Sequence, residues 1–339
     1  MINLRFYLPL AFALCSNVAT ADDVEKFFKE KSLRILVGYA TGTGYDIYAR
    51  ALGRHIGAHI PGNPKVVPQN MPGAASLVMM NHLYNVAPRD GTAIALPARN
   101  LFVEPLLGND RAQYDPRKFS MIGNMSRDVA LCVAWHTTGI ASVADVRRRE
   151  VLVAATSPSA ITAIYPQVLN SVLKTKMKII TGYTDSKAIS VALESGEVEA
   201  YCGYSIASIR SAHPDWLNKK LVNIFVQLGL EKSPELPETS FVMDFVQDQS
   251  SKDVLSLVFG DLTLGRPVIG PPVIPTERLR ALRDAFDKTM TDPGFLADAS
   301  KVKIDIEPMN ATEADKILRQ ILDVRPEIVQ RVNQIRQLK

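Results

Sequence analysis

The chain has 339 residues, 47% of them hydrophobic, and a formal net charge of +4. A chain of this length exceeds what one hydrophobic core usually organises, so we expect two domains. The mild positive balance, with no dense basic run, excludes a nucleic-acid-binding surface and is compatible with a small anionic ligand.

Residues 1–21 have the features of an export signal. Arg5 supplies a positive charge, residues 6–14 are apolar, and residues 19–21 (Ala-Thr-Ala) fit a small-x-small cleavage site. The apolar run is too short to span a bilayer, and no later segment is long and apolar enough to do so. We therefore expect a periplasmic protein that is cleaved after Ala21, with a net charge of about +3 once Arg5 is lost.

The stretch 33–60 predicts a strand, a glycine-rich turn and a helix. Residues 33–37 are an apolar run typical of a buried strand, Gly42 and Gly44 follow where the backbone must turn, and Asp46 stands near the helix start. Such a turn directs free backbone N–H groups at a ligand, and the helix dipole favours negative charge there. A tight turn without a ligand is the alternative interpretation.

Two nucleotide-binding patterns do not fit this turn. The dinucleotide fingerprint requires a third glycine three residues after the second, where this chain has Ile47. The P-loop requires Gly-Lys followed by Ser or Thr, and the turn has no such ending. A carboxylate is therefore the anion that the turn favours.

Strand-like and helix-like segments alternate along the rest of the chain. We expect further strands at 65–68, 93–96, 130–135, 151–155, 178–180, 198–201 and 221–226. We expect helices at 76–86, 160–173, 186–193 and 276–290, and further helices that begin at Ser142, Thr312 and Pro326. This alternation indicates a mostly parallel sheet, or two such sheets, with ligands beyond the carboxyl ends of the strands. The proline-rich segment 265–272 is a candidate crossing between domains.

Two cysteines remain after cleavage of the signal, Cys132 and Cys202. In an oxidising compartment they could form a disulfide. The alternative is that both are small buried apolar residues. Sequence alone does not give the distance between them, so both interpretations stay open.

The chain shows no pattern of catalytic or metal-binding residues. His55 and His59 have the i, i+4 spacing of a metal pair, but no glutamate follows His55 and arginines crowd the helix, so a solvated face is favoured. No Gly-x-Ser-x-Gly elbow is present, and no serine has an evident base. We therefore expect neither catalytic residues, nor a metal, nor a cofactor.

Several loop side chains have two interpretations each. Asp46 could contact a ligand, but capping of its helix is favoured. Tyr39 and Tyr183 could line a cleft and donate hydrogen bonds, with partial burial as the alternative. Arg99 and Arg127 could meet a second carboxylate, although a surface or interdomain role is favoured for each.

The order of several short motifs resembles one known family. Residues 39–50 (YATGTGYDIYAR), 70–75 (NMPGAA) and 87–92 (APRDGT) are similar to the first ligand loop, the second loop and a following turn of the tripartite tricarboxylate transporter receptors. These are the TctC or Bug family of extracytoplasmic solute-binding proteins. Residues 180–183 (ITGY) and 194–198 (ESGEV) also resemble a branch of this family.

The resemblance implies a type II periplasmic binding protein-like fold, in which two α/β domains joined by crossing strands close on a small ligand, typically a carboxylate. We expect domain 1 at 22–128 and 230–339, and domain 2 at 129–229. The implied ligand residues are Thr41, Gly42, Thr43, Gly44 and Asp46 in the first loop, Asn70, Pro72, Gly73 and Ala74 in the second, and Thr156, Ser157, Ser159 and Ala160 in the second domain. Ala75 stands where the family commonly has a second glycine.

These expectations lead to three candidate functions. The first is a monomeric periplasmic receptor that captures a small organic anion and delivers it to the membrane subunits of a transporter. The second is a receptor with the same ligand site that serves a signalling protein. The third, which is the least favoured, is an exported enzyme acting on a small acid.

Overall fold

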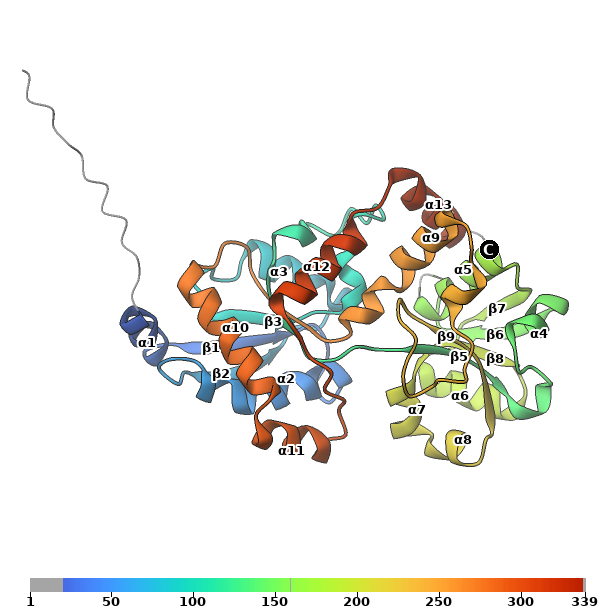
Figure 1. Ribbon diagram of the computed structural model, residues 1–339, viewed down its shortest axis with the longest axis horizontal. Coiled ribbons are helices and arrows are strands. Elements are labelled where there is room, and N and C mark those ends of the chain that lie inside the picture. Colours follow the sequence, from blue (N-terminus) through green and yellow to red (C-terminus); the bar gives the residue numbers. More distant parts are fainter. Residues whose placement is uncertain (1–20, 159, 338–339) are drawn as a thin grey trace, which may run out of the picture.

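The computed structural model describes residues 21–158 and 160–337, which form two lobes side by side (Figure 1). Lobe A contains a six-stranded sheet of order β11-β4-β10-β3-β1-β2, and lobe B a five-stranded sheet of order β7-β6-β8-β5-β9. The part of the export signal that covers residues 1–20 lies outside the described residues. In the part that is described, no helix is long and apolar enough to cross a membrane.

Each strand of lobe A either contains a short apolar run of the sequence or pairs with a strand that does. The strands are β1 (Ser32–Val37), β2 (Lys65–Asn70), β3 (Ala93–Leu96), β4 (Ser120–Asn124), β10 (Pro267–Gly270) and β11 (Met309–Asn310). Strands β2 and β3 run parallel to β1, whereas β10 and β11 are antiparallel to their neighbours.

Helices cover both faces of the lobe A sheet. They are α1 (Ala21–Lys29), α2 (Gly44–His55), α3 (Leu77–Asn85), α10 (Thr276–Met290), α11 (Pro293–Lys301) and α12 (Ala311–Leu322). Helices α2 and α10 cover one face of the sheet, where Ile35 and Phe286 belong to the buried core. Helices α3 and α12 cover the opposite face of the sheet. The apolar spacing along these helices explains their positions.

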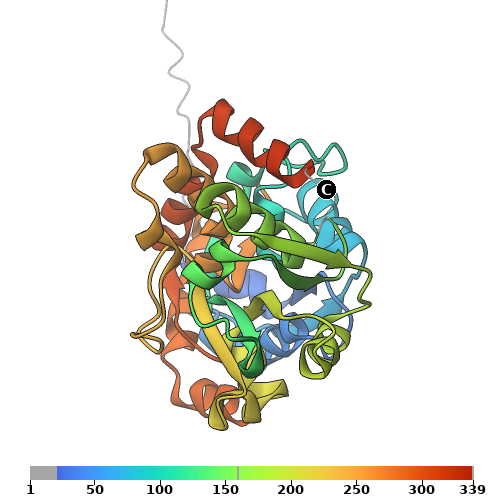
Figure 2. The same ribbon diagram turned by 90° about the vertical axis from the view of Figure 1, so that its right-hand side faces the viewer.

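Lobe B is built in the same way. Its strands are β5 (Ala130–Trp135), β6 (Val151–Ala155), β7 (Met177–Thr181), β8 (Ala200–Ser205) and β9 (Val222–Leu228). Its helices are α4 (Val143–Arg148), α5 (Ile161–Leu173), α6 (Ser186–Ser195), α7 (Ile206–Ala212) and α8 (Pro214–Asn218). Figure 2 looks onto this lobe, with helices above and below its sheet.

The chain crosses between the lobes three times. Residues 125–129 lead from β4 to β5, and the return from β9 to β10 includes α9 (Gln249–Phe259) and the short helix η7 (Gly260–Leu264). The two crossings pair through backbone hydrogen bonds, from Asp128 N to Leu262 O at 2.9 Å and from Arg266 N to Ser126 O at 3.1 Å. Residues 323–325 then carry the chain back, so that α13 (Pro326–Gln337) packs against α5 and α9.

A disulfide and a shared core tie these elements together. Cys132 on β5 and Cys202 on β8 are directly opposite each other in the antiparallel pair, are fully buried, and form a disulfide. One apolar cluster runs without interruption from α3 in lobe A to α5 in lobe B, through residues such as Phe102 and Leu262. The lobes therefore share part of their core at the hinge.

The structure corrects several predictions about the elements. Both sheets are mixed, since the strands next to the crossings run antiparallel. Strands β4 and β10 were missed, and β10 is part of the segment predicted as a crossing. Strand β8 begins at Ala200 and continues to Ser205, beyond the predicted end at residue 201. Asn310, not Thr312, caps α12, and the cap position of α10 is Pro275, not Thr276.

Candidate functional site

Asp46 holds the first predicted loop in shape. Its carboxylate oxygen Oδ2 accepts hydrogen bonds from the backbone N–H of Gly42 at 2.8 Å and from Arg50 Nε at 2.9 Å, and its Oδ1 accepts one from Asn70 Nδ2 at 2.8 Å. Burial raises the pKa of Asp46, but these hydrogen bonds outweigh it and keep the pKa below the usual value. The capping prediction is wrong, because Thr43 occupies the cap position of α2.

Asn70 joins the first loop to the second. It is the last residue of β2, and its side-chain nitrogen also donates to the backbone oxygen of Tyr39 at 2.9 Å. Its side-chain oxygen accepts from Arg50 at 3.0 Å and from the hydroxyl of Thr41 at 3.3 Å. The two loops that resemble the first and second ligand loops of the family therefore lie next to each other in lobe A.

The second loop is strained. Ala74, Ala75 and Ser76 have φ values of 44°, 52° and 80°, which form a run of three non-glycine residues in the left-handed region. Each such residue costs about 1 kcal/mol. Ser76 is fully buried, and a Cβ atom at Gly38 would lie 1.6 Å from its hydroxyl oxygen. Only glycine at position 38 leaves room for this arrangement, and strain of this kind is typical of ligand-binding turns.

Three helices that follow the predicted loops begin without a side-chain cap. They are α2, α3 and α5, whereas α6, α7, α9, α11 and α12 each have a capping side chain. Helices α8 and α10 also lack such a cap, and both have proline at their start. The first N–H groups of α2 and α5 are thus not bound by a capping side chain, whereas those of Leu77 and Val78 in α3 donate to the backbone oxygens of Ala74 and Gly73.

The predicted loops of lobe B also adjoin one another. The backbone N–H of Gly182 donates to Thr156 O at 3.3 Å, and Thr156 N donates to the hydroxyl of Thr162 at 3.1 Å. The hydroxyl of Tyr183 donates to Glu197 at 2.6 Å, and burial together with this carboxylate raises the pKa of Tyr183 to about 12. Ser157 has an interaction within the protein, and Ser159 lies outside the described residues.

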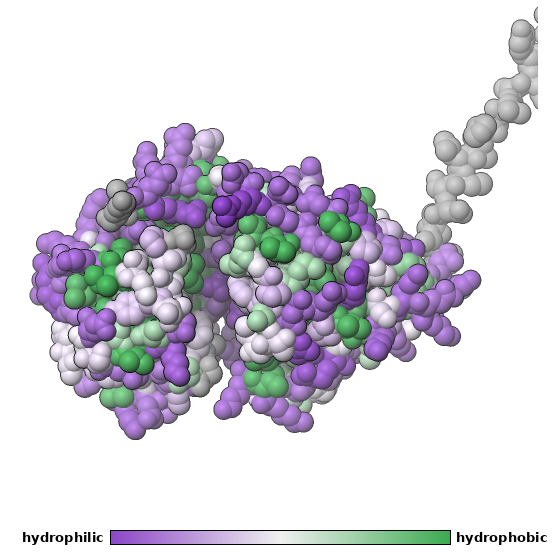
Figure 3. Space-filling model, turned by 180° about the vertical axis from the view of Figure 1, so that it is seen from behind, coloured by the Kyte–Doolittle hydropathy of each residue, from purple (hydrophilic) through white to green (hydrophobic). Residues whose placement is uncertain are grey.

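The exposed members of the predicted set belong to lobe A. Thr41, Gly42, Gly44, Pro72 and Ala74 are exposed, and Thr43 and Gly73 are half-buried. Tyr39 stacks on Tyr45 with ring centroids 4.9 Å apart, and the guanidinium of Arg266 lies over the Tyr45 ring at 4.6 Å. A groove separates the lobes in the space-filling view (Figure 3).

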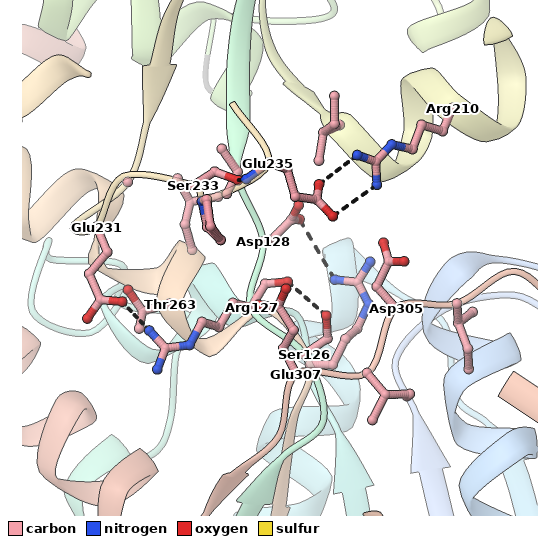
Figure 4. A pocket seen from close by; sticks show the side chains of 18 of the residues that line it. Ser126, Arg127, Asp128, Arg210, Glu231, Ser233, Glu235, Thr263, Asp305 and Glu307 are labelled. Atoms are coloured by element: carbon pink, nitrogen blue, oxygen red, sulfur yellow. Dashed lines mark hydrogen bonds and ion pairs between the residues drawn. The ribbon is translucent and has the colours of Figure 1, made fainter. Parts of the chain in front are cut away.

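A cavity of about 580 Å³ lies between the lobes (Figure 4). We call it the side chamber. Its walls include Tyr48 of α2, Arg210 of α7 and residues 299–300 and 303–307 of lobe A. Arg210 pairs with Glu235 at 2.7 Å, and Arg127 pairs with Glu231. Among the described residues that line the side chamber, none comes from the predicted ligand set.

His55, the last residue of α2, and His59, in the short helix η1 (Ile56–His59), do not form a solvated face. His55 Nε2 lies 3.0 Å from Asp298 of α11 and His59 Nε2 lies 3.1 Å from Asp292, the cap residue of α11, so two histidine–aspartate pairs attach α11 to α2 and η1. The histidines face different carboxylates. Within residues 21–158 and 160–337, no group of three or more potential ligands is arranged around a metal position.

Sequence reasoning missed the residues at the hinge. Arg99 was considered, but its partners Asp128 and Asp261, at 2.8 Å and 3.6 Å, were not. Tyr165 of α5 and Arg266 lie near them. These residues lie far apart in the chain. Arg266 alone had a local signal, because it lies within the proline-rich segment 265–272.

Solved structures share this two-lobed arrangement. A TctC solute-binding protein from Polaromonas matches with a TM-score of 0.71 and 14% identity, over 90% of this chain and 98% of the other. The periplasmic binding protein BugD matches with a TM-score of 0.62 and 16% identity, over 90% and 98%. MatC from Rhodopseudomonas palustris, solved with bound malate, matches with a TM-score of 0.60 and 15% identity, over 91% and 99%.

These similarities establish the fold of the chain. It is the two-lobed α/β fold of periplasmic solute-binding proteins, as the sequence predicted. No protein-family model matches the sequence, and no curated protein matches it either.

Proposed function

We propose that this protein is a periplasmic receptor of the TctC or Bug type that captures a small organic anion, a carboxylate, for a tripartite tricarboxylate-type transporter. The observation that carries the proposal is the pairing of two loops in lobe A, the first of which leads into α2, a helix that begins without a side-chain cap. A carboxylate suits the first N–H groups of α2, because the helix dipole favours negative charge. The carboxylate of Asp46 in the same turn is held by Gly42, Arg50 and Asn70.

In this proposal the loops of lobe A bind first and lobe B closes over the ligand. The backbone N–H groups near Gly44 and Ala75 receive the carboxylate, and Thr41 and Thr43 add hydroxyl groups. Thr156 and Ser157, at the uncapped start of α5, complete the site from lobe B. Binding then shifts the equilibrium between open and closed forms, since the enclosed hydrogen bonds exist only in the closed form. No catalytic step is involved.

Asp46 and Asn70 have a different role in this proposal. Their polar side-chain atoms already bind the loop backbone, Arg50 and each other. We therefore assign them to positioning the two loops, while the neighbouring backbone contacts the ligand.

A thermal-shift panel tests the proposal. It should include mono-, di- and tricarboxylates, malate and adipate among them, together with aromatic acids, amino acids and neutral amides. A ligand at about a hundred times its dissociation constant stabilises the protein by roughly 2.7 kcal/mol. A shift with at least one carboxylate is expected. Stabilisation by a neutral compound and by no carboxylate would contradict the anion proposal and leave the receptor proposal intact.

The variant Gly44→Val separates binding from folding. A Cβ atom at Gly44 would have only the side chain of Arg266, at 3.8 Å, in reach, so the substitution should change the free energy of unfolding by less than about 1 kcal/mol. Binding of the ligand from the panel should fall at least tenfold. Gly53→Ala on the same helix is the control, because a Cβ there meets Pro68 at 3.2 Å, away from the loop. Equal losses of binding and stability in Gly44→Val would indicate a purely structural turn.

The partners follow from the same proposal. We propose that the protein is a monomer and that it binds the transporter's membrane subunits. Sedimentation at the monomer mass, and retention of the liganded protein by membranes that contain those subunits, are the expected results. Retention by a sensor protein instead would indicate the signalling role.

A further inference from the structure

A buried group of charges lies beneath the first loop. It consists of Arg99, Asp128, Tyr165, Asp261 and Arg266, which we call the polar cluster. Arg99 donates to Asp128 at 2.8 Å, its Nε lies 3.6 Å from Asp261, and Arg266 lies 4.0 Å from Asp128. The members come from the crossings, from lobe A and, through Tyr165 on α5, from lobe B.

The cluster is in direct contact with the loop residues. The backbone N–H of Arg99 donates to the hydroxyl of Tyr45 at 3.3 Å, and Arg266 lies over the Tyr45 ring. The backbone N–H of the preceding Ala98 donates to Ser76 of the second loop. A change of charge in the cluster therefore acts directly below the site proposed for the anion.

The hydrogen bonding of the cluster is incomplete. Four of its buried atoms make no regular hydrogen bond: Arg99 Nε, Tyr165 OH, Asp261 Oδ1 and Arg266 Nε. Arg99 still interacts with Asp261, 3.6 Å from its Nε, and with the hydroxyl of Tyr165. Two guanidinium groups face two carboxylates, so the cluster is neutral while both aspartates are ionised. A proton on Asp261 would turn an acceptor that lacks a regular hydrogen bond into a donor.

The surroundings of Asp261 disfavour its charge. It faces Arg99 from the short helix η3 (Arg99–Phe102), Asp128 from the first crossing and Tyr165 from α5. The other helices packed on η7 are α9 and α12, which bring Phe259 and Ile321. Burial is the largest effect and raises the pKa of Asp261 to about 6, and the charge of Asp128 adds to it against the attraction of Arg99.

We propose that Asp261 takes up one proton when the cleft captures an anion, so that binding is tighter at mildly acidic pH. The proposal rests on the proposed function, because it assumes an anion above the cluster. Protonation changes the cluster from neutral to a charge of +1. For charges about 10 Å apart at an effective dielectric constant of about 20, this strengthens anion binding by roughly tenfold.

The first experiment needs no ligand. Urea unfolding from pH 4.5 to 8 compares the purified wild-type protein with Asp261→Asn and with the control Asp305→Asn, an exposed carboxylate in the side chamber. Because the folded-state pKa lies above the unfolded value, the wild-type protein should lose stability relative to Asp261→Asn as the pH rises through about 6 and then level off. Over this pH range the unfolding constant should change by roughly thirtyfold. Asp305→Asn should follow the wild-type profile.

If the difference in the free energy of unfolding between the wild-type protein and Asp261→Asn does not change from pH 4.5 to 8, the proposed protonation of Asp261 is wrong. If the variant does not fold, a carboxyl-carbon NMR titration of the wild-type protein decides the same point. One aspartate resonance should titrate near pH 6, and the absence of any such resonance also overturns the proposal.

The second experiment measures coupling to the ligand. Calorimetry gives the affinities at pH 5.5 and 7.5 for malate, adipate and every other carboxylate that stabilises the protein in the thermal-shift panel, and Asp261→Asn corrects for the titration of the ligands themselves. The wild-type protein should gain roughly tenfold more affinity at pH 5.5 than the variant does. Equal gains would refute the coupling. Absence of binding of every carboxylate of the panel at both pH values would contradict the proposed function and the coupling together, while the first experiment still reports on Asp261.

Discussion

The substitution Gly38→Ala tests the contact between the first strand and the second loop. Gly38 follows β1, and a Cβ atom there would lie 1.6 Å from Ser76 Oγ, 2.3 Å from its Cβ and 2.8 Å from its Cα. No rotation of one side chain removes all three overlaps, because the last involves the backbone. The start of α3 has to move.

The cost can be estimated from the packing. Overpacking a filled core typically costs 1–3 kcal/mol, and Ser76 is fully buried with its hydroxyl on Ala98 N. We expect Gly38→Ala to lose about 3 kcal/mol. Ser76→Gly alone should change stability by less than about 1 kcal/mol, because the loss of a long hydrogen bond is offset by relief of a left-handed serine.

The double variant Gly38→Ala, Ser76→Gly should regain about 1–2 kcal/mol of that loss, since only the contact with the Cα atom remains. Urea unfolding of the four proteins measures the coupling. A loss below about 0.5 kcal/mol in Gly38→Ala, or strict additivity in the double variant, would refute the close contact and with it the described shape of the second loop.

Three further changes have defined outcomes. Asp46→Asn should cost about 3 kcal/mol at pH 7, because it disrupts hydrogen bonds to a buried carboxylate. Since the pKa of Asp46 is lowered in the folded protein, the stability difference between the wild-type protein and Asp46→Asn should shrink as the pH falls through that pKa. A difference in urea unfolding that does not depend on pH would contradict an ionised, hydrogen-bonded Asp46. Replacing Cys132 and Cys202 with alanine removes a link across 70 residues and should cost about 4 kcal/mol in urea unfolding; a loss below 1 kcal/mol would count against it. Gln227→Met removes three buried hydrogen bonds to the segment after β9, so trypsin should cut there faster than in the wild-type protein, whereas an unchanged rate would show that the segment is held by other contacts.

The sequence predicted the elements that carry their own local signal. Strand β1 is an apolar run, and Pro326 starts α13 as expected of a first-turn proline. Strands β4 and β10 were not recognised because glycine and proline interrupt them, and their pairing partners lie far away in the chain. A distant antiparallel partner stabilised these residues as strands where their local propensity did not.

In the candidate site, too, some features had a local signal in the sequence and others did not. The glycines of the first loop and the Asn-x-Pro-Gly pattern were visible as turns, and the structure brings them together through Asp46 and Asn70. The full set of hydrogen bonds of Asp46 was not predictable, because its partners lie in three places: Gly42 in the turn, Arg50 on α2 and Asn70 at the end of β2. The polar cluster was invisible for a stronger reason. Arg99 meets Asp261 only because η3 packs on η7, and Asp128 joins them because the two crossings run side by side.

The three crossings also limit how the lobes can move. A single linker would let lobe B swing and twist about lobe A in any direction. Of the three connections, two are joined by backbone hydrogen bonds, so twisting or sliding at this pair would break those bonds and bending would not. In the proposed closure, the loops of lobe B would therefore return to the same place opposite those of lobe A each time. Reproducible alignment would then be a property of the hinge, and the ligand would have only to hold the lobes together.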